Sequence, residues 1–230
     1  MLILALDTSS AGGSAAVARD GGVTAIRAGD PSRTHGEQLP GVLMSALAAE
    51  GHALRDVDLF AVSIGPGSFT GLRVGIATMQ GLAHANAKLV VPVTTFEALA
   101  WPTRGNDQPI ATWVDAHRGE VFATLLSANR QQLAEPSSLA PSATLERWAP
   151  LVSSLGSIRF TGDGAIRYRE IIEAALHDRA VIEEEVPPLA SAIAEIAASD
   201  PSRAVRPHAV APLYVRRPDA ELARERAART

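Results

Sequence analysis

The sequence predicts an α/β protein built from two similar lobes, and three observations lead to this prediction. An apolar strand that ends in an aspartate opens the chain, "LILALD" at 2–7. The same theme returns as "IATWVD" at 110–115. Between them, "WPTRGNDQPI" combines two prolines with a glycine and polar residues, which is typical of a boundary. We therefore expect an internal duplication, with one mixed-sheet lobe at 1–104 and a second at 105–230.

The first lobe begins with three short strands. Residues 2–28 contain apolar stretches separated by the glycine-bearing turns "TSSAGG" and "DGG", a pattern that predicts a β-meander. A helix is expected from His35 to just before Gly51, because apolar residues then recur at i, i+3 and i+4. Pro40 fits this helix only in its first turn, where its missing N–H has no consequence.

A glycine-rich loop, "SIGPGSFTG", follows the buried strand expected at 57–64 and precedes a helix expected at 71–85. With the strand "KLVVPV" these elements form a β-α-β unit, which implies a parallel pair of strands and a right-handed crossover. Such a loop can present backbone N–H groups to an anion. The spacing of a nucleotide loop is missing, however, because the nearest basic residue, Arg73, falls inside the helix.

The helix after this loop carries small residues in two sets spaced by four, namely Gly71 and Gly75, then Ala77, Gly81 and Ala85. Glycine inside a helix costs about 1 kcal/mol relative to alanine, so these residues require a packing reason. Close approach of another backbone supplies one. Both the protein's own sheet and a partner remain candidates for that backbone.

The second lobe repeats the opening theme. The segment "IATWVDAHRGEVFATLLSANRQ" reads as strand, aspartate-bearing turn, strand and turn, and "IRFTGDGA" as a strand followed by a glycine turn. The segments "YREIIEAAL" and "LASAIAEIAAS" have the periodicity of helices. We expect both helices to belong to this lobe.

Composition excludes several classes of site and location. The 230 residues are 47% hydrophobic, but no apolar run reaches the length of a membrane helix and no signal-peptide pattern opens the chain, so we expect a cytoplasmic protein. The absence of cysteine excludes disulfides and thiolate metal sites. A net charge of −4 argues against a broad nucleic-acid surface.

Candidate site residues lie in the turns. Asp7, Thr8 and Ser9 occupy the first hairpin turn and Asp115 the matching turn of the second lobe, where facing aspartates could hold Mg²⁺ and phosphates. Turn stabilisation by the same side chains is the favoured alternative. In "TGDGA", Gly162 and Gly164 can admit a nucleotide, or can form an ordinary turn.

Other catalytic arrangements find little support. No two of the six histidines are spaced three to five residues apart, so a zinc site from local sequence is not expected. The chain has no Gly-x-Ser-x-Gly elbow, and Ser68 has no evident base. At the second turn, Asp115, Arg118 and Glu120 form a charged cluster that suits a structural role.

Five segments together resemble the bacterial TsaB (YeaZ) family: "LALDTSS", "HGEQLPG", "SIGPGSFTGLRVGIATMQGLA", "DAHRGEVFA" and "APLYVRRP". The resemblance runs from Leu4 to Pro218 and implies the two-lobed fold of actin, Hsp70 and sugar kinases. It also implies a non-catalytic subunit that helps to make threonylcarbamoyladenosine next to the tRNA anticodon. The implied partners are TsaD, which transfers the threonylcarbamoyl group, and TsaE, a small ATPase; when alone, the chain can pair with a second copy of itself.

The resemblance further implies a docking face for TsaD on the helices that begin near His35 and Gly71. Its implied residues are His35, Leu39, Val42, Leu43, Ala46, Leu72, Gly75 and Met79. No cofactor is expected on this chain, because ATP and metal belong to the partner subunits, and tRNA is expected to bind only through the complex. The interlobe cleft is then vestigial, with Asp7, Thr8, Ser9, Asp115, Gly162 and Gly164 as its remnants.

Two features of the chain agree with a non-catalytic role. TsaD carries a His-x-x-x-His metal pair on the corresponding helix, whereas here Leu39 follows His35 at the second position. After Asp115, the side chains of Ala116, His117 and Arg118 stand where kinases of this fold have glycine. The alternatives are a weak ATPase that uses the two aspartates, a peptidase, and a purely structural homodimer.

Overall fold

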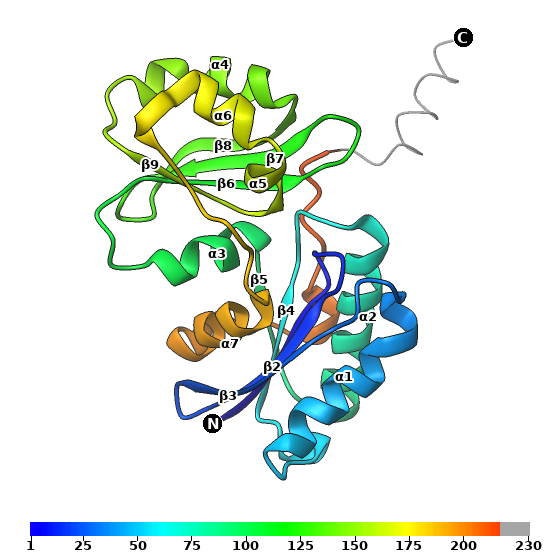
Figure 1. Cartoon of the computed structure of the whole chain (residues 1–230). Helices are drawn as coiled ribbons and strands as arrows, with labels where there is room; N and C mark the ends of the chain where they lie inside the picture. Colours follow the sequence, from blue (N-terminus) through cyan, green and yellow to red (C-terminus); the bar gives the residue numbers. More distant parts are fainter. Residues whose placement is uncertain (217–230) are drawn as a thin grey trace.

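The computed structural model describes residues 1–216 and contains two five-stranded sheets, one above the other in Figure 1. The first sheet has the order β3-β2-β1-β4-β5. Its strands are β1 (Leu2–Asp7), β2 (Ser14–Arg19), β3 (Gly22–Ala28), β4 (Leu59–Ser63) and β5 (Val90–Val93). β1, β2 and β3 are antiparallel neighbours, whereas β1, β4 and β5 run parallel. The predicted meander and β-α-β unit are thus confirmed.

The second sheet repeats this arrangement. Its order is β10-β9-β6-β7-β8, and its strands are β6 (Ile110–Asp115), β7 (Val121–Leu126), β8 (Gln132–Leu139), β9 (Ile158–Thr161) and β10 (Ala180–Ile182). β6, β7 and β8 form an antiparallel meander, and β9 and β10 run parallel to β6. Read in the opposite direction, the second sheet has the order β8-β7-β6-β9-β10, which is the order of the first sheet with five added to each strand number. The internal duplication expected from the sequence is therefore present in the topology.

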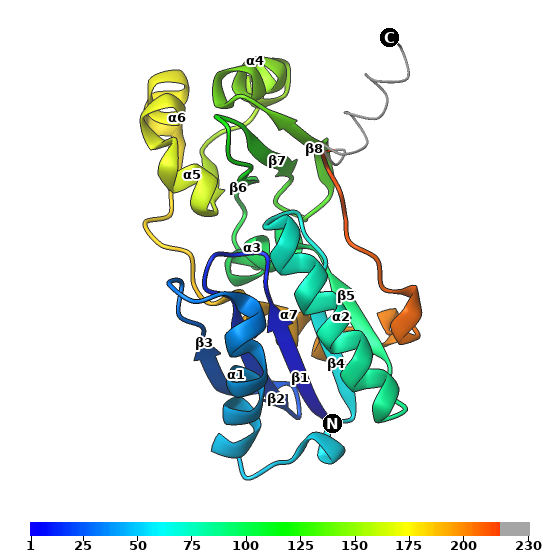
Figure 2. The ribbon, with the colours of Figure 1, turned by 90° about the vertical axis from the view of Figure 1, so that its right-hand side faces the viewer.

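Helices cover both faces of the first sheet. α1 (His35–Ala49) and α2 (Phe69–Ala85) lie side by side on one face, and α7 (Leu189–Ser199) lies on the other (Figure 2). The alternation of β1 explains both layers, since Leu4 and Leu6 pack with α1 and α2 while Ile3 and Ala5 pack with α7. This sheet is therefore apolar on both faces.

The C-terminal part of the chain requires a correction to the predicted boundary. α7 was expected in the second lobe, but it packs on β1 and β2 of the first, and residues beyond it continue along the first lobe. Val205 bridges to Val90 of β5, and the Leu213 N–H donates to the Ile64 carbonyl at 2.7 Å. The second lobe therefore ends before α7, and residues 189–213 return to the first lobe (Figure 1). Arg216 then contacts the second lobe, where it pairs with Glu120 at 3.1 Å.

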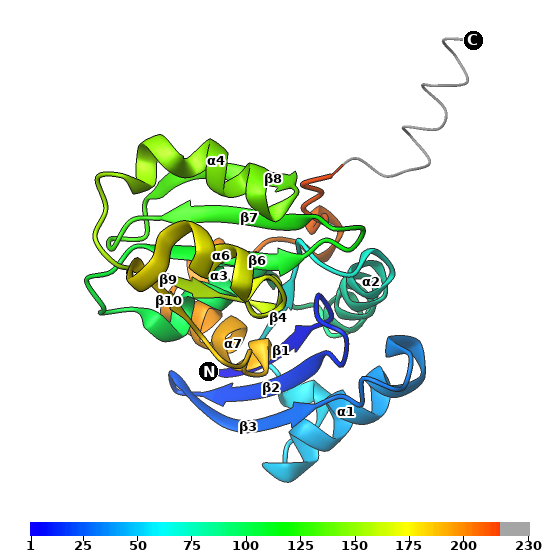
Figure 3. The same ribbon diagram turned by 45° about the horizontal axis from the view of Figure 1, so that its top comes forward.

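The second lobe has its own apolar core. α4 (Pro141–Val152), α5 (Asp163–Arg167) and α6 (Arg169–Leu176) flank its sheet (Figure 3), and Trp113, Trp148 and Phe160 pack edge to face between them. The sequence analysis did not predict α4, which begins with a proline at its first position, where proline is favoured. α3 (Thr95–Ala100) lies between the two sheets and was also missed.

Candidate functional site

α1 and α2 each present one face to the first sheet and one face to solvent. Inward, Leu39, Leu43, Ala46 and Met79 join the core beneath the sheet. Besides Glu37, Ala49, Phe69, Thr70 and His84, the exposed residues are Gly36, Pro40, Gly41, Met44, Ser45 and Ala48 on α1, and Arg73, Ala77, Gly81 and Ala85 on α2; most of these ten are small. We call these ten residues the outer face.

The structure revises the residues expected to dock a partner. Leu39, Leu43, Ala46, Leu72, Gly75 and Met79 are buried within the chain itself, and His35 and Val42 are half-buried. The i, i+3, i+4 pattern identifies the apolar face of a helix, and here that face is covered by the protein's own sheet. The two helices keep an exposed surface, but it consists of the outer face rather than of these side chains.

The two sets of small residues in α2 have different surroundings, which explain why each set is small. A Cβ atom at Gly75 would overlap the hydroxyl of Thr8 and lie 2.9 Å from its Cγ2, and one at Gly71 would overlap the Thr8 carbonyl. A Cβ at Gly81, by contrast, would meet nothing within 4 Å, and Ala77 and Gly81 are exposed. Gly71 and Gly75 therefore admit the protein's own first turn, and only the second set faces outward.

The glycine-rich loop supports α2 rather than forming an open phosphate cradle. The Ser68 N–H donates to the Ser9 carbonyl at 2.9 Å, and the Ser68 hydroxyl accepts the Gly71 N–H at 3.2 Å as the N-cap of the helix. Gly67 also approaches Ser9 so closely that a Cβ there would lie 2.8 Å from the Ser9 Cβ. The loop thus fixes the start of α2 against the first hairpin turn.

His35 fills the space where α1, α2 and the first turn meet. Cβ atoms at Gly13 and Gly71 would lie 3.3 Å and 2.7 Å from carbons of its ring, so both glycines make room for it. Its Nδ1 is buried without a hydrogen-bond partner. Within residues 1–216, no three His, Asp or Glu side chains come together as metal ligands would.

The aspartate of the first turn is fully used by that turn. Asp7 is buried; its Oδ1 accepts the Ser9 N–H at 2.9 Å and the Ser9 hydroxyl at 2.6 Å, and its Oδ2 accepts the Ser10 hydroxyl at 2.7 Å. Thr8 is also buried, with its N–H donated to the Ser63 hydroxyl at 3.1 Å. This geometry corresponds to the turn-stabilising alternative.

The aspartate of the second turn is paired with a cation of the chain. Arg167 Nη1 lies 2.8 Å from Asp115 Oδ2, and His117 Nδ1 lies 3.6 Å from the same oxygen. Gly162 and Gly164 allow α5 to approach β6, since a Cβ at Gly162 would overlap the Trp113 carbonyl. Both glycines therefore serve close packing rather than ligand entry. The ion pair with Arg167 also uses the Asp115 carboxylate, which a metal-bound nucleotide would require.

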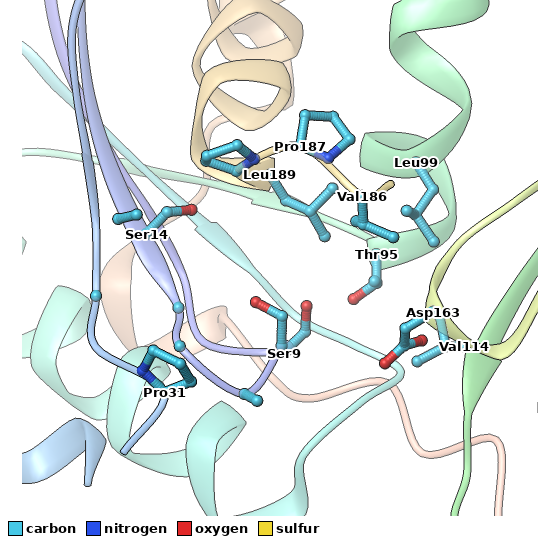
Figure 4. Close-up of a pocket in the computed structure, with 17 residues that line it drawn as sticks. Ser9, Ser14, Pro31, Thr95, Leu99, Val114, Asp163, Val186, Pro187 and Leu189 are labelled. Carbon is cyan, nitrogen blue, oxygen red and sulfur yellow. The ribbon is translucent and has the colours of Figure 1, made fainter. Parts of the chain in front are cut away.

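A cavity of about 350 Å³ separates the lobes, and Figure 4 shows the polar tips of Ser9, Thr95 and Asp163 directed into it. Its opposite wall is apolar, with Leu99 and Leu189. Among residues 1–216, none that lines it is Lys, Arg or His. Burial by the cavity walls raises the pKa of Asp163, and the charge of Asp115 adds to this effect.

The residues of this cavity do not fit Mg²⁺ and ATP, which the fold would otherwise suggest. Both carboxylate oxygens of Asp7 already accept hydrogen bonds from Ser9 and Ser10 of its own turn, and Asp115 lines a different cavity, of about 420 Å³, beside the glycine-rich loop. In the described part of the chain, no basic side chain lines the first cavity to balance a triphosphate. Of the six predicted cleft residues, Asp7, Thr8 and Ser9 form the first turn and Asp115 belongs to an ion pair. The two glycines, Gly162 and Gly164, allow close packing.

Comparisons with known proteins identify the family. A family model described as "TsaD: tRNA N6-adenosine threonylcarbamoyltransferase" matches residues 10–228. The tRNA threonylcarbamoyladenosine biosynthesis protein TsaB of Escherichia coli is 36% identical over 125 residues, which cover 53% of either chain. The match thus spans about half the length of that relative.

Solved structures extend the comparison to almost the whole chain. A Pseudomonas aeruginosa protein described as similar to peptidase YeaZ superposes with a TM-score of 0.78 at 28% identity, over 94% of this chain and 99% of the other. A ROK family protein from Streptococcus pneumoniae shares the fold alone, with a TM-score of 0.52 at 10% identity, over 88% of this chain and 99% of that one. The two-lobed, actin-like fold expected from the sequence is confirmed. The chain belongs to the family that the matching model describes, and within it to the TsaB (YeaZ) proteins.

Proposed function

We propose that this chain is a non-catalytic subunit of the complex that makes threonylcarbamoyladenosine in tRNA, and that the outer face of α1 and α2 docks a TsaD protein. The observation that carries the proposal is the row of small exposed residues on this face. Cβ atoms at Gly36, Gly41 and Gly81 would meet nothing within 4 Å, so another helix can approach these backbones closely. The name of the Escherichia coli relative supplies the pathway.

The charge pattern of the cleft supports the non-catalytic part of the proposal. With Asp7 bonded to its own turn and Asp115 to Arg167, the ATP and metal of the reaction are expected on the partner subunits. A TsaE protein joins the pair, and tRNA binds through the assembly, in the cytoplasm. No helix of residues 1–216 is long and apolar enough to cross a bilayer.

Mixing the purified chain with the TsaD protein of the same organism tests the proposal directly. Size-exclusion chromatography with light scattering should show a heterodimer. Any homodimer of the chain should dissociate when TsaD is added, because the homodimer and the heterodimer would both use the outer face. Two separate peaks at micromolar concentrations would contradict the proposal. A weak ATPase and a peptidase remain the alternatives, and both would show turnover by the chain alone.

A further inference from the structure

A second groove, of about 630 Å³, lies between the lobes and shares no lining residue with the interlobe cavity described above. One wall belongs to the first lobe, from α3, the turn after it and α7. The other wall is the β7–β8 hairpin of the second lobe. Pockets of roughly 300 to 1,000 Å³ at the junction of two structural units are typical sites for small molecules. Neither the docking face nor the aspartate turns use this groove.

The first-lobe wall combines an apolar part with the charged side chains of Glu97, Arg104 and Arg203. Phe96, Ala100 and Ile196 are almost fully buried, and the half-buried ring of Trp101 continues their surface. The Trp101 indole N–H already donates to Glu195 Oε2 at 2.7 Å, so the ring needs no polar partner from a ligand. This wall suits a flat apolar group.

The arginines that line the groove differ in how their charges are balanced. Arg104 pairs with Glu195 at 2.8 Å and Arg203 with Glu97 at 2.9 Å. The guanidinium of Arg130 instead donates to the carbonyls of Thr103 and of Ala128, the latter at 3.2 Å.

Within residues 1–216, no carboxylate lies within ion-pair distance of Arg130, although the exposed Glu135 also lines the groove. Partial burial lowers the pKa of Arg130, which remains partly exposed to solvent. Some of its five N–H donors are not used by the two carbonyls. A ligand anion at this position would supply the missing charge.

We propose that this groove binds a small amphipathic molecule, with a carboxylate at Arg130 and a flat apolar body against Phe96 and Trp101. Arg130 already joins the hairpin of the second lobe to Thr103 of the first. A molecule seated beside it contacts both lobes and adds to the contacts that already join them. The proposal is independent of the docking of TsaD, because the groove shares no residue with the outer face.

The test uses 2-naphthoate as the probe and the neutral 2-naphthamide as its matched control. The chain has three tryptophans, and Trp113 and Trp148 are 0% and 1% exposed, so the three indole N–H signals in a nitrogen-15 spectrum report on distinct places. Naphthoate at millimolar concentration should shift the Trp101 signal, assigned with a Trp101→Phe variant, and leave the other two in place. Naphthamide should bind at least about tenfold more weakly, because it lacks the charge.

Two arginine variants locate the anion. Arg130→Gln should weaken naphthoate binding by about tenfold or more, and Arg130→Lys should restore part of the affinity. Arg179→Gln is the matched control, because Arg179 likewise donates to backbone carbonyls, those of Val152 and Leu155, but lines a groove between α4 and α6. It should change the affinity less than twofold.

Three results would overturn the proposal: an unmoved Trp101 signal, equal binding of the acid and the amide, or equal losses in the Arg130 and Arg179 variants. Circular dichroism of each variant checks folding. If Arg130→Gln does not fold, the comparison of acid and amide on the unaltered protein still decides.

Discussion

Glycines of one helix have opposite surroundings in this protein. Gly75 faces the buried Thr8, where a Cβ atom has no room, whereas Gly81, six residues later, faces open space. A six-residue separation turns the chain by roughly 600° in an α-helix, so the two positions point to different sides. The same residue type thus reports on internal packing at one position and on an exposed surface at the other.

Gly75→Leu is expected to lower folding stability. Overpacking a tight contact costs about 1 to 3 kcal/mol, and for a chain of this size about 1 kcal/mol lowers the melting temperature by roughly 2 to 4 °C. Thermal melting by circular dichroism measures the effect. Gly81→Leu is the matched control, and its melting temperature should equal or exceed that of the unaltered protein, since leucine favours a helix over glycine. An unchanged melting temperature for Gly75→Leu would show that Thr8 yields without cost.

Asp163→Asn is expected to preserve or raise stability at neutral pH. The Oδ1 atom of the carboxylate accepts the N–H groups of Asp115 and Gly164 at 2.9 and 2.8 Å, and an asparagine oxygen in its place can accept both without the cost of burying a charge. Because burial raises the pKa of Asp163 above 3.8, the wild-type contribution is largest below that pH and is lost as pH rises through the folded-state pKa. The advantage of asparagine should therefore grow between pH 3 and pH 7. A variant that melts lower than wild type only at pH 7 would show that the negative charge stabilises the fold.

At the scale of elements, α1 and α2 combine two separate tasks. Their inner faces complete the core of the first lobe, and the glycine-rich loop sets the start of α2 against the first turn. Their outer faces are then presented as one rigid surface, because the first turn, the loop and His35 are packed together at the ends of both helices. A preordered surface of this kind loses little conformational entropy when a partner binds.

Gly81→Leu is expected to weaken the heterodimer without loss of folding. If a partner helix lies on the outer face, the added side chain separates the two backbones at a cost of about 1 to 3 kcal/mol, or roughly 5- to 150-fold in the dissociation constant. Isothermal titration with TsaD measures it. Ala174→Leu, which alters an exposed alanine of α6 in the other lobe, serves as the control. Equal affinities for the two variants would place the docking surface elsewhere.

At the scale of the whole molecule, the two lobes enclose a cavity that retains the topology of a nucleotide-binding fold without its charges. Asp115 is neutralised by Arg167, and the cavity lined by Asp163 has no basic residue. The apolar contact between lobes, which includes Val114 and Phe122 of the second lobe and α7 of the first, holds this arrangement in place. The lobes thus form one body rather than two domains hinged by a nucleotide.

The isolated chain is expected to bind Mg²⁺ and ATP at least about a hundredfold more weakly than a typical ATPase site, with a dissociation constant in the millimolar range. It should also show no metal-dependent threonylcarbamoyl transfer. Isothermal titration and an assay without TsaD measure these properties. Stoichiometric zinc or iron in the purified protein, together with turnover, would refute the non-catalytic assignment.

The isolated chain is also expected to bind tRNA weakly. Its net charge of −4 leaves no excess of cations to displace the counterions of the phosphate backbone. Filter binding at physiological salt should give an affinity weaker than micromolar for the chain alone and a tighter one after TsaD is added. Submicromolar binding by the isolated chain would mean that basic residues are concentrated on one surface despite the negative net charge.

The order and type of most elements, and the likeness of the two lobes, are predictable from the sequence alone. The β-meander, the β-α-β unit and both C-terminal helices follow from periodicity, since a strand or helix that buries one face must place its apolar residues at fixed intervals. The loop "GPGSFTG" and the two aspartate turns could be located in the same way. The family resemblance also rested on these local segments.

Which segment packs on each apolar face depends on the tertiary structure and could not be predicted from the sequence. α7 returns to the first sheet instead of staying with the second, Leu39 and Met79 face the core rather than a partner, and Asp115 pairs with Arg167, which lies 52 residues away. Periodicity records that a side chain must be covered but not which backbone covers it, because that choice depends on contacts between segments distant in sequence. The outer face consists largely of exposed glycine and alanine, and the pattern of large apolar residues in α1 and α2 does not indicate it.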